Sequence, residues 1–335
     1  MVTTPAFASR ARPEAATDAL ARIAVVIPCF RVSRQVMDVL RRIGPEVDRV
    51  FVVDDACPER TGDLVTRECA DPRVVVIRHE QNRGVGGATK TGYRAALAEA
   101  MDVVVKVDGD GQMDPAFVPA LVRSIVSGRA DYTKGNRFYD LELLRGMPRV
   151  RLFGNAMLSL VNKAASGYWD VMDPTNGYTA IHCKALSMLP LDKLDDRYFF
   201  ESDMLFRLST IRAVVRDVAM AARYEGEPSS LRVGRVAVSF PAKYLRAVLK
   251  RMFYSYFLRD FNAASLQFLL ALVLAVAGVG FGIAKWIESN VTGVPATPGT
   301  VMLAALPTLV AIQLLLSALH YDIGNVPREP LQGRD

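Results

Sequence analysis

The sequence predicts an α/β fold, with a mostly parallel sheet flanked by helices, followed by a membrane-anchoring segment. Short apolar runs alternate with helical patterns between residues 23 and 110. Polar clusters follow these runs, and two long uncharged stretches lie between residues 263 and 319. Because continuous apolar strands are buried on both faces, the runs favour a parallel sheet that is covered by helices on both sides.

Four β-prone runs define the first part of the sheet, at 23–27, 50–53, 74–77 and 103–107. The segments between them, such as 33–43 and 85–100, are long enough for crossover helices, which gives βαβα order. The pattern is less regular after residue 130. It predicts further strands at 131–133, 177–181 and 213–218, and helices at 152–165 and 199–208.

The expected organisation has five parts. They are a flexible leader at 1–21, a catalytic domain at 22–228, amphipathic juxtamembrane helices at 229–262, a membrane segment at 263–321 and a cytoplasmic tail at 322–335. The leader lacks the apolar core of a signal peptide, so the first domain is expected to stay in the cytoplasm.

Residues 241–260 mix Lys and Arg with aromatic and aliphatic residues at helical spacing, which is typical of a membrane-surface helix. An ordinary docked surface helix is the alternative. Two transmembrane helices are then expected, at about 263–287 and 299–320, since each uncharged stretch can cross a hydrocarbon core of ~30 Å. Two buried core helices are the alternative here.

The connection at 288–298 holds no Lys or Arg, whereas basic residues flank the pair of spans. The positive-inside rule then places both ends in the cytoplasm, as in a multi-pass protein of the inner (cytoplasmic) membrane. Gly278 and Gly282 have the small-xxx-small spacing that permits close helix packing, which favours a homo-oligomer.

The chain carries a net charge of +6, with 41 Lys and Arg against 35 Asp and Glu. This balance favours an anionic partner such as a lipid or a phosphorylated substrate, or the cytoplasmic side of a membrane protein. No aromatic-plus-basic motif indicates nucleic acid. The four cysteines have no CxxC spacing, so neither a disulfide framework nor a zinc site is expected.

Asp108-Gly109-Asp110 directly follows the fourth apolar run. Two carboxylates two residues apart at a strand end can reach one hard divalent cation, which usually shares its coordination with substrate phosphates. Gln112 lies two residues further on. A solvated turn is the alternative interpretation.

Two other strand ends are polar. Asp54 and Asp55 follow the second run and can accept hydrogen bonds from a base or ribose, or cap the helix that begins near Thr61. The Gly-rich segment 82–92 opens a helix. Thr89 breaks both the Walker A and the dinucleotide pattern, so the glycines indicate either close approach to a ligand or tight helix packing.

Roughly between residues 22 and 225 the chain carries, in order, the motifs IPCF, VVDDACPERTGD, EQNRGVGGATKTGYRAAL, VVKVDGDGQMDP, GNRF, DPTNGYTAIHCKAL and FFESDM. This set resembles the family 2 glycosyltransferases of GT-A fold. Among those, the chain is similar to polyprenyl-phosphate glycosyltransferases of the dolichol-phosphate mannose synthase type, in particular the bacterial membrane-anchored ones.

The resemblance implies inverting transfer of a single sugar from a nucleotide sugar to a polyprenyl (undecaprenyl-type) phosphate. The implied metal is Mg²⁺ or Mn²⁺, at Asp108, Asp110 and Gln112, and Asp203 and Arg137 join the two aspartates as catalytic residues. The donor-binding residues that it implies are Pro28, Asp54, Asp55, Gly84, Lys90, Asp108 and Gly109.

The resemblance also assigns the acceptor. The lipid phosphate would meet Arg137, Arg149, Arg151 and Asn155, and the acceptor side would include Gly177, Tyr178, Glu201 and Asp203. Asn155 stands where these enzymes have Ser, and Cys29 and Phe30 replace the Asn-Glu that many have after the first Pro. The QxxRW motif of processive synthases is absent, which favours transfer of one sugar.

UDP-glucose is the first expected donor, with GDP-mannose and UDP-N-acetylhexosamines as alternatives. The acceptor is alternatively a lipid or glycan hydroxyl, which requires a general base, and Asp203 is the candidate. A third hypothesis is a non-catalytic membrane scaffold that binds nucleotide sugars. In each case the lipid bilayer is a partner.

Overall fold

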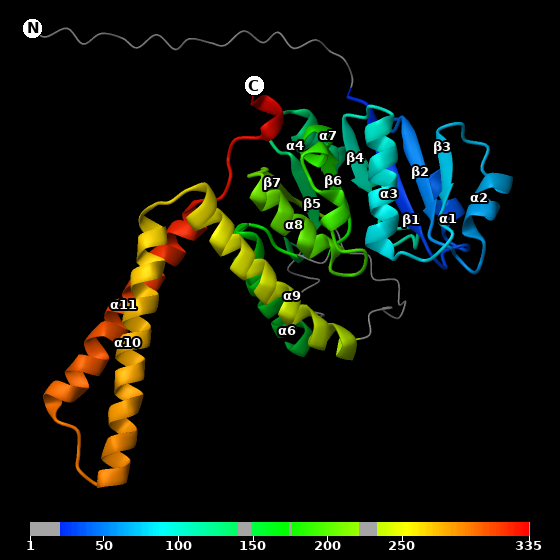
Figure 1. Ribbon diagram of the computed structural model, residues 1–335. Coiled ribbons are helices and arrows are strands. Elements are labelled where there is room, and N and C mark those ends of the chain that lie inside the picture. Colours follow the sequence, from blue (N-terminus) through cyan, green and yellow to red (C-terminus); the bar gives the residue numbers. More distant parts are fainter. Residues whose placement is uncertain (1–20, 140–148, 174–175, 221–232, 335) are drawn as a thin grey trace, which may run out of the picture.

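The computed structural model describes residues 21–139, 149–173, 176–220 and 233–334. Within these ranges, a seven-stranded sheet lies at the centre of the N-terminal domain, in the order β3-β2-β1-β4-β6-β5-β7 (Figure 1). Its strands are β1 (Ile23–Cys29), β2 (Arg49–Asp54), β3 (Val74–Arg78), β4 (Val103–Lys106), β5 (Tyr132–Asn136), β6 (Thr179–His182) and β7 (Val215–Ala219).

The strand pairing explains where a site forms. Strands β1 to β4 pair in parallel, as the sequence predicts. β6 runs antiparallel to both β4 and β5, which the sequence did not reveal. Because the order reverses between β1 and β4, the turn after β4 lies at a topological switch point, where open α/β sheets bind ligands.

Alternate strand residues bury the two faces of the sheet. Ala24 and Val26 pack in one core with helices α3 (Val85–Ala98), α7 (Cys183–Ser187) and α8 (Phe200–Thr210). Val25 and Ile27 pack in a second core with α1 (Val36–Arg41), α2 (Thr61–Glu68) and α4 (Val118–Val126). The predicted three-layer arrangement is therefore confirmed, with cores on both faces.

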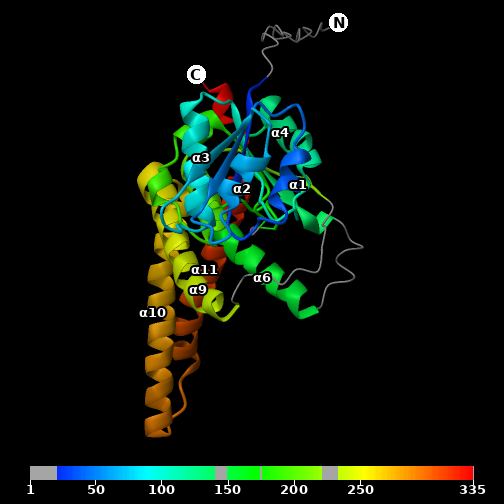
Figure 2. The ribbon, with the colours of Figure 1, turned by 90° about the vertical axis from the view of Figure 1, so that its right-hand side faces the viewer.

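Two amphipathic helices lie against one another below the sheet (Figure 2). They are α6 (Arg149–Ser166) and α9 (Val233–Phe253), and α9 continues into a π-helical segment, η4 (Tyr254–Arg259). Helix α6 and the buried face of α9 share a small apolar core with α8. The other side of both helices is exposed, with large apolar side chains at Phe153, Met157, Leu160, Leu245, Leu249 and Phe253.

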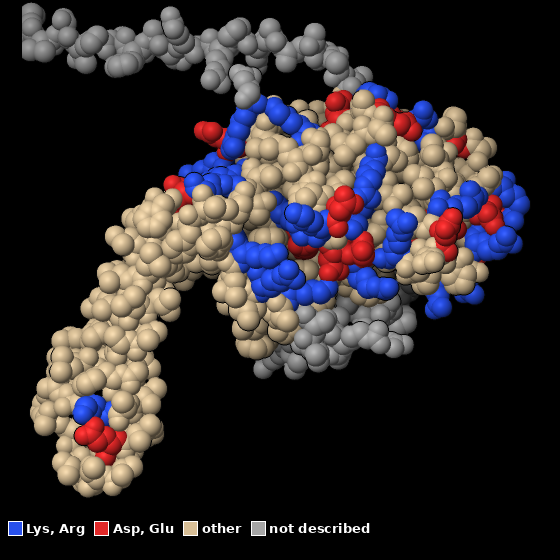
Figure 3. Space-filling view, viewed as in Figure 1, with Lys and Arg blue, Asp and Glu red and all other residues tan. Residues whose placement is uncertain are grey.

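Helices α10 (Ala263–Thr292) and α11 (Pro298–Gly324) form an antiparallel hairpin that projects from the domain. Both are long and apolar enough to cross a membrane, and only 11% of the residues in each apolar stretch are buried. That exposure excludes the alternative of two core helices. Figure 3 shows the hairpin bare of charge except near its far end, where Lys285 pairs with Glu288 at 2.7 Å.

Helix α10 is longer than expected. It continues to Thr292, through residues that the sequence assigned to the connection. The glycines expected to favour an oligomer also serve a different purpose. A Cβ at Gly278 would lie 2.9 Å from Ala304 O, and one at Gly282 would lie 3.2 Å from Ala304 Cβ. The small face therefore packs α10 on α11 within one chain, so it gives no support to the predicted homo-oligomer.

The last residues, expected as a cytoplasmic tail, pack on the N-terminal domain. Leu331 is buried, and its N–H donates to Asp131 Oδ1 at 2.8 Å. The Gln332 side chain donates to the carbonyl oxygens of Ile125 and Ala130. The chain thus returns from the hairpin to the segment that leads into β5, which ties both ends of the hairpin to one body.

Candidate active site

The turn after β4 presents two carboxylates at the carboxyl edge of the sheet. Asp110 Oδ1 accepts from the Gln112 N–H at 3.1 Å, which closes the turn, and the Asp108 side chain is 29% exposed. A Cβ at Gly109 would lie 3.1 Å from Val32 Cγ2, so the turn packs closely on the segment after β1. Gly111 has φ +80°, a conformation that glycine adopts without strain.

Lys106, the last residue of β4, lies directly beneath this turn and is 1% exposed. Its Nζ donates to Asp108 Oδ1 at 2.8 Å and to Glu201 Oε1, on α8, at 3.3 Å. Burial by itself lowers the pKa of Lys106, but the two carboxylates outweigh it and raise the pKa above its usual value. The lysine is therefore a fixed cation between two acidic groups.

Gly177 closes this cluster from the side of β6. Its carbonyl accepts from Lys106 Nζ at 3.4 Å. A Cβ at Gly177 would lie 2.5 Å from that Nζ and 3.1 Å from Asp108 Oδ2, so only glycine fits the present arrangement. The neighbouring Tyr178 is buried, and its hydroxyl donates to Asp114 O at 2.8 Å. Gly177 thus lies in the cluster, whereas the Tyr178 side chain supports the turn from behind.

Arg137 follows β5, next along the same edge. It forms a two-bond ion pair with Asp173, from Nε to Oδ2 at 2.7 Å and from Nη2 to Oδ1 at 2.9 Å. Asp173 is buried and has φ +48°, whereas the Arg137 side chain is 32% exposed. A buried carboxylate thus orients a partly exposed guanidinium, which is a suitable geometry for an anionic ligand.

A second buried lysine lies behind Arg137. Lys134, in β5, donates from Nζ to the carbonyl oxygen of Asn176. Burial lowers the pKa of Lys134 to about 8, although the nearby carboxylates of Asp173 and Glu201 oppose the shift. The loop that leads into β6 is therefore held by lysines from both of its neighbouring strands.

Helix α8 separates the two acidic residues predicted for the acceptor side. Glu201 reaches Lys106, whereas Asp203 Oδ2 accepts from the Asp195 N–H at 2.9 Å and from Arg207 Nε at 3.2 Å. Burial raises the pKa of Asp203, against the opposing effect of Arg207. Glu201 is thus joined to the cluster at Asp108, and Asp203 holds the segment before α8.

Asp54, the last residue of β2, and the following Asp55 are both buried, and their carboxylates accept hydrogen bonds from backbone N–H groups. Asp54 accepts from the N–H groups of Cys57 and Gly62, at 2.8 and 2.6 Å. Asp55 accepts from the N–H groups of Arg83 and Gly84, at 2.8 and 2.7 Å. Asp54 therefore stabilises the start of α2 and Asp55 the Gly-rich segment, and their contacts with a nucleoside stay predictions, as do those of the buried Pro28.

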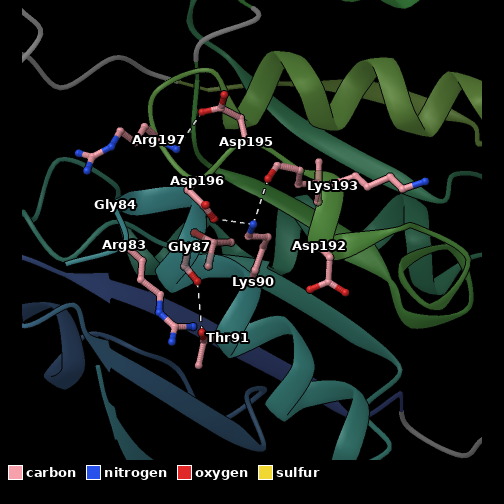
Figure 4. A network of polar contacts seen from close by, with 12 residues as sticks. Arg83, Gly84, Gly87, Lys90, Thr91, Asp192, Lys193, Asp195, Asp196 and Arg197 are labelled. Carbon is pink, nitrogen blue, oxygen red and sulfur yellow. Dashed lines mark hydrogen bonds and ion pairs between the residues drawn. The ribbon is translucent and has the colours of Figure 1, made fainter. Parts of the chain in front are cut away.

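The glycines and Lys90 of the Gly-rich segment face the residues that precede α8 (Figure 4). Lys90 Nζ pairs with Asp196 Oδ1 at 2.5 Å and donates to Leu194 O at 3.0 Å. A Cβ at Gly84 would lie 2.5 Å from Asp196 O. In this arrangement both residues hold the segment at 194–196, and their predicted contact with the donor stays a prediction.

The remaining acceptor residues fall in the first turns of α6. The side chains of Arg149, Arg151 and Asn155 lie outside the described residues. Three residues of this site, Lys106, Lys134 and Asp173, were not predicted from the sequence. The signal for the first two was present, because a lysine within a buried strand requires a carboxylate or carbonyl partner.

The donor set at the turn suits a shared metal ion. In the described part of the chain, no group of three His, Cys, Asp or Glu side chains is placed to hold a metal. Two carboxylates without a protein cage fit Mg²⁺ or Mn²⁺, which complete their coordination with phosphate oxygens and water.

A model of the family described as Glycosyl transferase family 2 matches residues 24–189. The undecaprenyl-phosphate mannosyltransferase of Micrococcus luteus is 32% identical over 213 residues, which is 62% of this chain and 86% of that protein. The chain belongs to glycosyl transferase family 2.

Other proteins extend the comparison. The UDP-N-acetylglucosamine–dolichyl-phosphate N-acetylglucosaminyltransferase of Methanococcus voltae is 26% identical over 68% of this chain and 96% of its own length. Glucosyl-3-phosphoglycerate synthase of Mycobacterium tuberculosis, crystallised with phosphoglyceric acid, superposes with a TM-score of 0.51 at 21% identity. That match covers 72% of this chain and 85% of the synthase, and it confirms the GT-A-like fold.

Proposed function

We propose that this chain transfers one sugar, with inversion, from a nucleotide sugar to a polyprenyl phosphate at the cytoplasmic face of a membrane. One observation carries the proposal. A strand-end carboxylate pair and an oriented arginine lie on one edge of the sheet, in a chain that also presents an exposed apolar hairpin. The relatives named for undecaprenyl and dolichyl phosphate support this class of acceptor.

The proposed division of labour follows the charges. Asp108 and Asp110 would hold Mg²⁺ or Mn²⁺, which would neutralise the charge that develops on the departing nucleoside diphosphate. A solved structure of the mycobacterial synthase contains Mn²⁺ and UDP-glucose, which supports a divalent ion and a UDP donor. Gln112 would lie beside the ion, and Lys106 holds Asp108 through a hydrogen bond from its Nζ.

On the acceptor side, a phosphate monoester is already largely anionic near pH 7, since its second pKa is ~6. It therefore needs cations rather than a strong base. Arg137, oriented by Asp173, would bind it, together with Arg149, Arg151 and Asn155 at the start of α6. An oxygen of the acceptor phosphate attacks the anomeric carbon as the bond to the diphosphate breaks.

The donor sugar is proposed as glucose, carried by UDP, with mannose and N-acetylhexosamine as the alternatives that the relatives' names support. The hairpin would cross the inner membrane and keep the domain where a polyprenyl chain can present its phosphate. The exposed apolar faces of α6 and α9 would lie on the same surface.

The test uses membranes that contain the full chain, incubated with labelled nucleotide sugars, polyprenyl phosphate and Mg²⁺ or Mn²⁺. We expect a labelled lipid whose formation stops on chelation and in Asp110→Asn. Asp38→Asn is the matched control, because this aspartate on α1 is exposed and its salt bridge with Arg42 is long, at 3.8 Å. No labelled lipid from any of the three donors would rule out the proposal.

The same assay separates the two acceptor classes. Asp203→Asn should cost orders of magnitude if the acceptor is a hydroxyl that needs a general base. With a phosphate acceptor, we expect a much smaller loss, due only to the weakened contacts with Asp195 and Arg207.

A further inference from the structure

A polar cavity of about 380 Å³ lies where the N-terminal domain, the end of α9 with η4, and the hairpin meet. Three arginines from three different elements line it. They are Arg212, after α8, Arg251, on α9, and Arg259, at the end of η4. Ser209 and Ser255 add hydroxyl groups to the lining. The proposed transfer reaction uses none of these residues.

One of the three arginines is neutralised within the protein. Arg251 is buried and donates from Nη1 and Nη2 to the two carboxylate oxygens of Asp322, at 2.7 and 2.9 Å. Trp169 Nε1 also donates to Asp322, at 2.8 Å. A Cβ at Gly167 would lie 2.7 Å from Arg251 Nη1, so glycine is required for the guanidinium to lie there.

The other two arginines have no carboxylate partner among the described residues. Arg212 Nη2 contacts only the neutral oxygens of Asn325, at 3.2 and 3.4 Å. The Arg259 guanidinium lies 5.2 Å from the centre of the Tyr254 ring. Asp260 also lines the cavity, but it is exposed and accepts from Asn262. The cavity thus retains an excess of positive charge.

The length of the hairpin fixes the level of this cavity relative to a bilayer. From Ala263 to Lys285, α10 rises roughly 33 Å at 1.5 Å per residue, close to a hydrocarbon thickness of ~30 Å. If the Lys285–Glu288 pair marks one interface, Arg259 marks the other. Helix α11 returns Asp322 to the same level, and Figure 3 shows Lys and Arg gathered where the hairpin meets the domain.

We propose that this cavity binds the phosphodiester head group of an anionic phospholipid. The inference rests on the membrane placement within the proposed function and not on the transfer reaction. Arg212 and Arg259 supply the charge, and Ser255 supplies a hydroxyl donor. Such basic pockets beside membrane helices suit anionic head groups. The bound lipid would hold the hairpin against the domain, at a site separate from Arg137.

The test uses the full chain, purified in detergent and incubated with equal amounts of phosphatidylglycerol and phosphatidylcholine. Native mass spectrometry then counts the retained lipids. We expect the wild type to retain phosphatidylglycerol, and Arg212→Gln/Arg259→Gln to retain it at least about tenfold less. Arg246→Gln, an exposed arginine on α9 outside the cavity, is the matched control and should match the wild type.

Three outcomes would overturn the inference. They are equal retention of both lipids by the wild type, unchanged retention in the double variant, and displacement of phosphatidylglycerol by inorganic phosphate at millimolar concentration. Thermal unfolding of the double variant without lipid checks that it folds. Transfer activity is measured separately, so that lipid retention without transfer contradicts the reaction and leaves the lipid site standing.

Discussion

The two halves of the sheet edge hold their charged groups in different ways. At the end of β2, Asp54 and Asp55 accept mainly from backbone N–H groups that lie close in the chain or in the next βα unit, and Asp55 also contacts His79 Nδ1 at 2.7 Å. After β4 and β5, the partners are charged side chains from distant elements. Lys106 and Glu201 are 95 residues apart, and Arg137 and Asp173 are 36 apart.

The difference separates support from chemistry. Carboxylates that accept hydrogen bonds from backbone N–H groups stabilise the fold. Charged side chains from different elements that face one another create an electrostatic site. The same long-range pattern recurs at the hairpin, where Arg251 and Asp322 are 71 residues apart.

Lys106→Met should have the largest effect, because it leaves Asp108 and Glu201 without their shared cation. Breaking a buried ion pair from one side costs about 3–5 kcal/mol of stability. We also expect transfer to be lost. Thermal unfolding and the labelled-lipid assay measure the two effects. Lys193→Met, at an exposed position, is the control, and equal behaviour of the two variants would contradict the role of Lys106.

Asp322→Asn should weaken the attachment of the hairpin, since the buried Arg251 loses its counter-charge. Hydrogen bonds to charged groups each contribute about 1.5–3 kcal/mol, so we expect a loss of about 3 kcal/mol. Unfolding in detergent measures it. Glu329→Gln, at an exposed position on the same return segment, should change little. A stable Asp322→Asn would show that the other contacts hold the hairpin without this ion pair.

Gly177→Ala should reduce the rate more than the stability. The added Cβ would displace Lys106 Nζ, so the carboxylate cluster loses its geometry, and a loss of about 1.4 kcal/mol in the transition state lowers the rate tenfold. Steady-state transfer at saturating donor tests this. Gly154→Ala in α6 is the matched control, because a Cβ there meets nothing within 4 Å.

Asp54→Asn should have the smallest effect on function. Its carboxylate accepts from the N–H groups of Cys57 and Gly62, and because an amide keeps one acceptor oxygen, we expect a loss of about 1 kcal/mol. We expect a slightly lower unfolding temperature and an unchanged KM for the donor. A strongly raised KM would instead show that Asp54 contacts the nucleoside, and would remove the contrast between the two halves of the edge.

The sequence by itself determined most of the secondary structure. Apolar runs gave strands β1 to β4, and uncharged stretches gave α10 and α11, because both signals lie in consecutive residues. It also placed Asp108 and Asp110 at a strand end. The sequence did not predict that β6 is antiparallel, because the direction of a strand depends on the strands with which it pairs.

Only the tertiary structure decided which charges meet. Nothing local pairs Lys106 with Glu201 or assigns Asp173 to Arg137. The small-residue face of α10 likewise found its partner within the chain. These cases share one physical reason. The sequence shows that a buried charge or an apolar helix face needs a partner, but only the folded chain determines which residue becomes that partner.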